Sequence, residues 1–189
     1  IEVASRGTLA VVEVADVVDA ASIETVDSRS LGIERANPGQ KDVTLHMSGI
    51  YTLPEVEACL RDMKEVQALG FGVAAIMSND ITTHPDDAPD KMKTLAREHG
   101  FTFPYLFDET QAVARAYGAA CTPDFFGFNR DLELQYRGRL DSNAIKPATP
   151  DTRQELVDAM RLIGETGRGP AKQIPSMGCS IKWRDGYAT

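Results

Sequence analysis

The chain has 189 residues, of which 42% are hydrophobic and 25% are charged, and its formal net charge is −8 at pH 7. This composition is that of a globular chain with one main domain, and the negative charge argues against nucleic acid or an anionic membrane surface as a partner. No apolar run approaches the roughly 20 residues that a membrane-spanning helix needs. No cleavable signal segment is visible, so we expect a cytoplasmic protein, with a signal removed ahead of Ile1 as the open alternative.

The cysteines are scattered along the chain. They are Cys59, Cys121 and Cys179, and no two of them have the spacing of metal ligands. We therefore expect no metal site and no cofactor. An odd number of cysteines leaves at least one thiol unpaired if a disulfide forms, which favours a reducing compartment or a redox role over a disulfide scaffold.

The first half of the chain predicts alternating helices and strands. A helix is expected over 9–21, a strand over 22–28 and a turn at Asn37-Pro38-Gly39. A second strand follows over 42–48. Pro54 then starts a helix that ends near Gly70, with an apolar stripe made of Val56, Leu60, Met63 and Val66.

The apolar run over 71–77 is typical of a central strand that is buried on both faces. The polar residues Ser78, Asn79 and Asp80 follow it, at the strand end where ligands bind in open α/β sheets. We therefore expect them to line a cleft, although Asn and Asp at this place also suit a turn.

The second half predicts three more helices and a hairpin. The segment 84–89 leads into a helix closed by Gly100, and residues 101–106 are extended. Thr110 is expected to cap a short helix that Gly118 ends.

Strands over 125–128 and 132–139 are joined by a turn, which predicts an antiparallel hairpin. Thr152 and Glu155 have capping-box spacing ahead of a helix, and the composition becomes loop-like after Gly164. Its predicted apolar face holds Leu156, Met160 and Ile163.

Several separate blocks of sequence resemble, in order, a bacterial branch of the thioredoxin-like superfamily related to alkyl hydroperoxide reductase and thiol-specific antioxidant proteins. The blocks are residues 76–80, 84–89, 103–111, 117–126, 136–138 and 175–183. The resemblance covers about residues 70–184. It implies an α/β thioredoxin-like three-layer sandwich, with a central mixed sheet flanked by helices.

The resemblance fails at the redox motif of that family. There, the strand before the first long helix ends in Cys-x-x-Cys-Pro, whereas residues 46–54 of this chain contain no cysteine. Disulfide exchange through that position is therefore impossible, and the active site is degenerate. Tyr51 and Thr52 stand in the corresponding stretch and are expected to contact substrate.

The resemblance also implies a cis peptide bond at Thr122-Pro123, with the backbone before it pairing with a substrate peptide. Cys121, beside that proline, is either a reactive thiol or a small buried side chain. Cys179 would pair with Cys121 in a disulfide or cover the site from the C-terminal side. Any remaining catalysis is expected at Cys121 and Cys179, whereas Cys59 is expected in the core.

Residues 1–66 are atypical for that family and resemble a bacterial microcompartment shell domain in short blocks. We therefore expect an N-terminal extension over 1–40, which is part of the shell-like segment if that resemblance holds. A thioredoxin-like domain is expected over 41–168 and a C-terminal tail packed on it over 169–189.

Three functions follow from these patterns. The first is a redox-family protein with a degenerate active site and residual thiol chemistry, for which the partner is a protein or peptide thiol. The second is a non-catalytic module that binds extended peptides at the cis-proline edge. The third is a structural protein that self-assembles through residues 1–66, which would make it a homo-oligomer.

Overall fold

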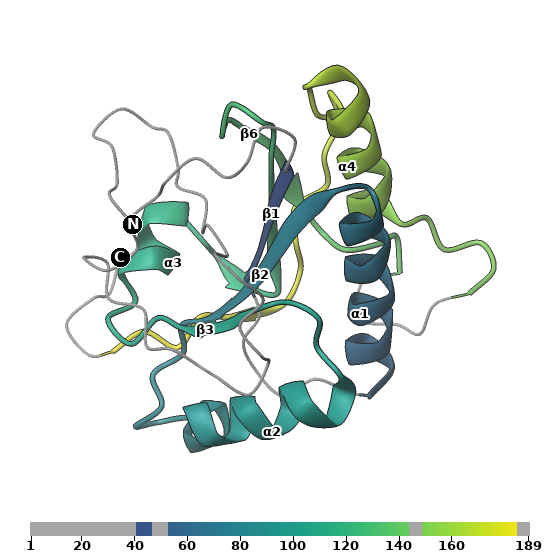
Figure 1. Ribbon diagram of the computed structural model, residues 1–189. Helices are drawn as coiled ribbons and strands as arrows, with labels where there is room; N and C mark the ends of the chain where they lie inside the picture. Colours follow the sequence, from purple (N-terminus) through teal and green to yellow (C-terminus); the bar gives the residue numbers. More distant parts are fainter. Residues whose placement is uncertain (1–40, 47–52, 144–148, 185–189) are drawn as a thin grey trace.

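Figure 1 shows the computed structural model of the protein, which describes residues 41–46, 53–143 and 149–184. The predicted helix over 9–21, the strand over 22–28 and the turn at 37–39 lie outside the described residues, as do Tyr51 and Thr52. The helices and strands, in chain order, are β1 (Lys41–His46), α1 (Leu53–Ala68), β2 (Phe71–Met77), the 3₁₀ turn η1 (Pro85–Asp87), α2 (Pro89–His99), β3 (Tyr105–Phe107), α3 (Ala112–Tyr117), β4 (Cys121–Thr122), β5 (Asp124–Phe128), β6 (Leu134–Gly138), α4 (Glu155–Thr166) and β7 (Cys179–Ser180).

A mixed five-stranded sheet in the order β3-β2-β1-β5-β6 forms the centre of the molecule. The strands β1, β2 and β3 are parallel, whereas β5 runs antiparallel to β1 and pairs with β6 in the predicted hairpin. The strands β4 and β7 form a separate two-stranded antiparallel ladder. The chain therefore has the predicted α/β class and mixed sheet, with the short ladder as an addition.

The sheet is buried on both faces, as the sequence of β2 predicts. Val73, Ala75 and Met77 belong to a core cluster with side chains of α1, α2 and α4. Ala74 and Ile76 belong to a second cluster, which includes side chains of α3 and the buried Ile181. Successive side chains of a strand point to opposite faces, so the sheet separates the two apolar clusters. Figure 1 shows α1 and α4 on one side of the sheet and α3 on the other.

Within the described residues the predicted helices are present, but the start of α3 and both ends of α4 differ from the prediction. The helix α3 begins with Gln111 in a left-handed conformation (φ 59°), while the Thr110 hydroxyl accepts a 3.3 Å hydrogen bond from the Ala112 N–H. The predicted capping box is wrong, because α4 begins at Glu155 and the Thr152 hydroxyl accepts a 2.7 Å bond from the Thr149 N–H.

The loop that the composition indicates after Gly164 begins slightly later in the structure. The helix continues to Thr166 and ends at Gly167, which has a φ of 75°. Glycine adopts this left-handed conformation without the steric cost that a side chain adds.

The C-terminal segment, residues 174–184, crosses the molecule beside the sheet and is drawn in yellow in Figure 1. It begins at β6, where the Arg139 N–H donates to the Ile174 carbonyl over 3.1 Å. It ends beside β2, where the Asp80 N–H donates to the Lys182 carbonyl over 2.9 Å. Between these points it contributes β7. The segment is therefore hydrogen-bonded beside β6 and beside β2, and its strand β7 lies between these two contacts.

Candidate functional site

The peptide bond between Thr122 and Pro123 is cis, as the resemblance to thioredoxin-like proteins implies. It joins β4 to β5, and the residues before it pair antiparallel with the C-terminal segment, Cys121 opposite Ser180 and Thr122 opposite Cys179. The chain's own backbone therefore occupies the edge at which the resemblance places a substrate peptide.

Gly178 allows this ladder to form. A β-carbon at position 178 would lie 2.1 Å from the Thr122 carbonyl oxygen and 3.3 Å from the Pro123 nitrogen. No carbon atom fits at 2.1 Å from a backbone oxygen, so only glycine permits this approach. The Thr122 hydroxyl adds a 3.3 Å hydrogen bond to the Cys179 carbonyl.

Cys121 lies half-buried beside the cis-proline, and its thiol donates a 3.6 Å hydrogen bond to the Pro123 carbonyl. Burial raises the pKa of this thiol, the Asp124 carboxylate raises it further, and the Arg137 guanidinium opposes both effects. The nucleophile in thiol chemistry is the thiolate. Cys121 thus lacks the environment that activates a cysteine.

Cys179 is exposed and lies on the neighbouring strand. In the register of this ladder, Cys121 shares one face with Ser180, while Cys179 shares the other face with Thr122. Side chains that point to opposite faces do not meet the geometry of a disulfide. The structure brings the two predicted thiols onto adjacent strands without aiming them at each other.

An ion pair holds the cis-proline loop to β6. The Arg137 guanidinium donates to the buried Asp124 carboxylate over 3.0 Å and to the Gly118 carbonyl over 2.5 Å. The Asp124 carboxylate also accepts a 3.2 Å bond from the Ala120 N–H. Sequence reasoning did not identify this pair, because it depends on how β5 and β6 meet in the hairpin.

The cleft predicted at Ser78, Asn79 and Asp80 is wrong, because all three side chains are buried. The Ser78 hydroxyl donates to Asp108 over 3.0 Å, and the Asn79 side-chain oxygen accepts a 2.9 Å bond from the Lys182 N–H. The C-terminal segment therefore covers the end of β2.

Gln111 joins the end of β2 to the C-terminal segment. Its side-chain amide donates to the Ser78 carbonyl over 2.7 Å and to the Lys182 carbonyl over 2.8 Å, while its oxygen accepts a 3.0 Å bond from the Arg184 N–H. This buried glutamine was also missed by sequence reasoning. No local sequence pattern predicts the left-handed backbone conformation of Gln111 at the start of α3.

The remaining cysteine, Cys59, is buried in the core as predicted, and burial raises the pKa of its thiol.

Among the described residues, no group of three or more His, Cys, Asp or Glu side chains could hold a metal ion. Within the same part of the chain, no helix is long and apolar enough to cross a membrane.

Comparison with known proteins identifies relatives. The model of the AhpC/TSA family matches residues 53–137. The crystal structure of an uncharacterized conserved protein from Geobacillus kaustophilus is 40% identical in sequence, with a TM-score of 0.71, over 78% of this chain and 79% of that one. A hypothetical protein from Sinorhizobium meliloti is 32% identical, with a TM-score of 0.72, over 78% and 82% of the two chains.

A more distant match shows the fold alone. An uncharacterized thioredoxin-like protein from Porphyromonas gingivalis has a TM-score of 0.51 at 19% identity, over 77% of this chain and 86% of that one. No curated protein matched the chain. The comparisons give no support to the microcompartment resemblance of residues 1–66. The fold, the matched segment and the two closely similar structures lead to one conclusion: the chain belongs to the AhpC/TSA family of thioredoxin-like redox proteins.

Proposed function

We propose that this protein is a redox-family protein with a degenerate active site, which keeps the thioredoxin-like fold and the cis-proline but does not turn over disulfides. Thiol–disulfide exchange needs an attacking thiolate, and turnover needs a second thiol that resolves the mixed disulfide. The observation that most directly supports this proposal is that residues 46–54, which lead into α1, contain no cysteine. The exposed N–H groups of a helix start therefore have no thiol to acidify.

Residual thiol chemistry is confined to the ladder beside the cis-proline. Cys59 is enclosed in the core, and burial raises the pKa of Cys121, which leaves Cys179 as the accessible thiol. A single thiol reacts with one peroxide molecule: the thiolate sulfur takes one oxygen and becomes a sulfenic acid, and the peroxide leaves as an alcohol or water. Without a partner thiol in reach, the sulfenic acid is not recycled within the chain.

Peroxide consumption tests this proposal. With one equivalent of hydrogen peroxide per chain and no added thiol, we expect mass spectrometry to find the cysteine oxidation on Cys179 as the sulfenic acid, because excess peroxide would carry it on to sulfinic and sulfonic acid. Cys179→Ser should remove that reaction, and Cys59→Ser should leave it unchanged. Continuous consumption in the presence of a dithiol reductant, lost on Cys121→Ser, would show that an active redox centre survives.

A second candidate, a module that binds extended peptides, is supported by the pairing of β4 with β7. This pairing indicates that the cis-proline edge accepts an antiparallel strand, so a partner peptide would have to displace the C-terminal segment. The single tryptophan, Trp183, lies on that segment and packs against the second core cluster, with the Arg115 guanidinium 5.4 Å from its ring. Its fluorescence therefore reports displacement.

The test is a titration of the full chain with a synthetic peptide of residues 174–182, which lacks tryptophan. Displacement should move the emission of Trp183 to longer wavelength in a saturable manner. A peptide with alanine in place of Gly178 is the matched control and should have no effect. Unchanged emission with both peptides would rule out binding at this edge.

A further inference from the structure

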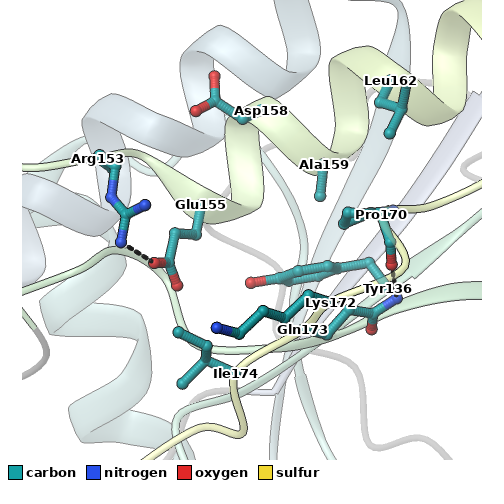
Figure 2. Close-up of a pocket in the computed structure, with 10 residues that line it drawn as sticks. All are labelled: Tyr136, Arg153, Glu155, Asp158, Ala159, Leu162, Pro170, Lys172, Gln173 and Ile174. Carbon is teal, nitrogen blue, oxygen red and sulfur yellow. Dashed lines mark hydrogen bonds and ion pairs between the residues drawn. The ribbon is translucent and has the colours of Figure 1, made fainter.

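A cavity of about 410 Å³ lies away from the cis-proline ladder, between α4, β6 and the segment 170–174 (Figure 2). This volume is within the range of small-molecule sites. One end of the cavity is apolar, and the other carries charged side chains.

The apolar end is formed by the ring of Tyr136 together with Ala159, Leu162 and Pro170, whereas Ile174 lies at the other end, beside Glu155. The Tyr136 hydroxyl donates a 2.6 Å hydrogen bond to the Arg139 carbonyl, so its polar atom is already used and the ring serves as a wall. Leu162 is 37% exposed, and part of its side chain lines the cavity. An apolar ligand would cover this surface.

The segment that closes the cavity is held in place by β6. A β-carbon on Gly169 would lie 1.8 Å from the Gln135 carbonyl oxygen, so the chain there lies directly on the strand. The Gln173 amide donates to the Gln135 carbonyl over 2.8 Å, and its oxygen accepts a 2.8 Å bond from the Arg137 N–H. The wall is therefore preformed, which reduces the entropy that a ligand must overcome.

The charged end has a surplus of positive charge. Both oxygens of Glu155 accept hydrogen bonds from Arg139, at 2.7 and 2.9 Å, and Asp158 pairs with Arg161 at 3.2 Å. Arg153 has one weak contact, 3.4 Å from Glu155. Lys172 forms no ion pair within 4 Å among the described residues, although its ammonium is near enough to Glu155 to help lower the pKa of that carboxyl.

Spare N–H donors and net positive charge at the cavity mouth favour an anion, although the chain as a whole carries a net charge of −8. We propose that the cavity binds a small monocarboxylate with an aromatic or branched apolar body. Its carboxylate pairs with Lys172 and Arg153, and its body lies between Tyr136 and Leu162. This site is independent of the thiols, so its existence does not rest on the function proposed above.

The test is isothermal titration of the full chain with 3-phenylpropionate. We expect saturable binding, weakened about tenfold by Lys172→Gln, the loss that follows from removing one charge-assisted contact. Lys93→Gln, an exposed lysine on α2, is the matched control and should bind like the wild type. The uncharged analogue 3-phenylpropan-1-ol should bind more weakly by a similar factor.

Amide chemical shifts locate the site independently. On titration, the changes should centre on Tyr136, Ala159 and the segment 170–174, with the ladder of Cys121 and Cys179 unaffected. Binding that is equally strong in Lys172→Gln, changes centred on the ladder, or no binding at millimolar ligand would each overturn the proposal.

Discussion

At the scale of single residues, the contact between Gly178 and Thr122 determines whether the C-terminal segment stays on the cis-proline ladder. The β-carbon of an alanine at position 178 would overlap the Thr122 carbonyl, 2.1 Å away, and neither backbone can yield without breaking β7. We expect Gly178→Ala to lower the free energy of unfolding by about 1–3 kcal/mol, the usual cost of overpacking.

Urea unfolding followed by Trp183 fluorescence measures this change. Met177→Ala is the control, because that neighbouring side chain is 66% exposed and its removal should cost little. Equal stability of Gly178→Ala and wild type would mean that the C-terminal segment does not pair with β4.

Asp62, on α1, gives the protein a specific pH dependence. Its carboxylate is buried, and one of its oxygens has no hydrogen-bond partner. Burial raises its pKa, although hydrogen bonds from Gln154 and Arg61 oppose the shift. Because the folded state then holds the proton more tightly than the unfolded state, stability falls as pH rises from the unfolded pKa to the folded one.

We therefore expect Asp62→Asn to reduce the loss of stability as the pH rises above about 4, the ordinary pKa of an aspartate, and to be no less stable than wild type at neutral pH. Chemical unfolding at several pH values provides the measurement, and Asp151→Asn, at an exposed position, is the control. An unchanged slope in Asp62→Asn would assign the pH dependence to other groups.

The residues that sequence reasoning identified differ physically from those that it missed. Cys59 was assigned to the core from its place beside an apolar stripe, a local pattern with a helical period. Gln111 and Gly178 were missed because each acts through a contact between distant positions, Gln111 with Lys182 and Gly178 with Thr122. Such contacts leave no periodic trace in the sequence.

At the scale of elements, the apolar periods of α1, β2 and α4, the hairpin of β5 and β6 and the glycines that end α2 and α3 were predictable, whereas both ends of α4 were not. The start of α4 is set by tertiary contacts: the Gln154 side chain donates to Asp62 over 2.8 Å and to Glu65 over 2.9 Å on α1. A capping box considers only local hydrogen bonds, so it placed the cap at Thr152.

The C-terminal segment depends on Ile181, which is 3% exposed in the core cluster on the α3 side of the sheet. Ile181→Ala should cost about 2–4 kcal/mol for the lost burial and the cavity left behind. Because Ile181 lies next to β7, the variant should also open the ladder and increase the rate at which a thiol reagent labels Cys121. Cys59, in the other cluster, should stay protected, and an unchanged rate at Cys121 would contradict the account.

At the scale of the whole molecule, the family and the fold are those of thioredoxin-like redox proteins, while two features of the chain differ from a dithiol enzyme. The stretch before α1 has no cysteine, and the cis-proline edge is paired with the chain's own β7. The cavity between α4 and β6 lies apart from both features. The absence of cysteine before α1 can be read directly from the sequence. The pairing of the cis-proline edge with β7 could not be predicted, because it depends on tertiary packing.

The most direct test of the central claim, that this protein does not turn over disulfides, is insulin reduction with dithiothreitol as the electron source and a thioredoxin as the positive control. The account predicts that the full chain adds nothing to the rate with dithiothreitol alone, and that Cys121→Ser and Cys179→Ser behave identically. A rate clearly above that background, lost on Cys121→Ser, would contradict it.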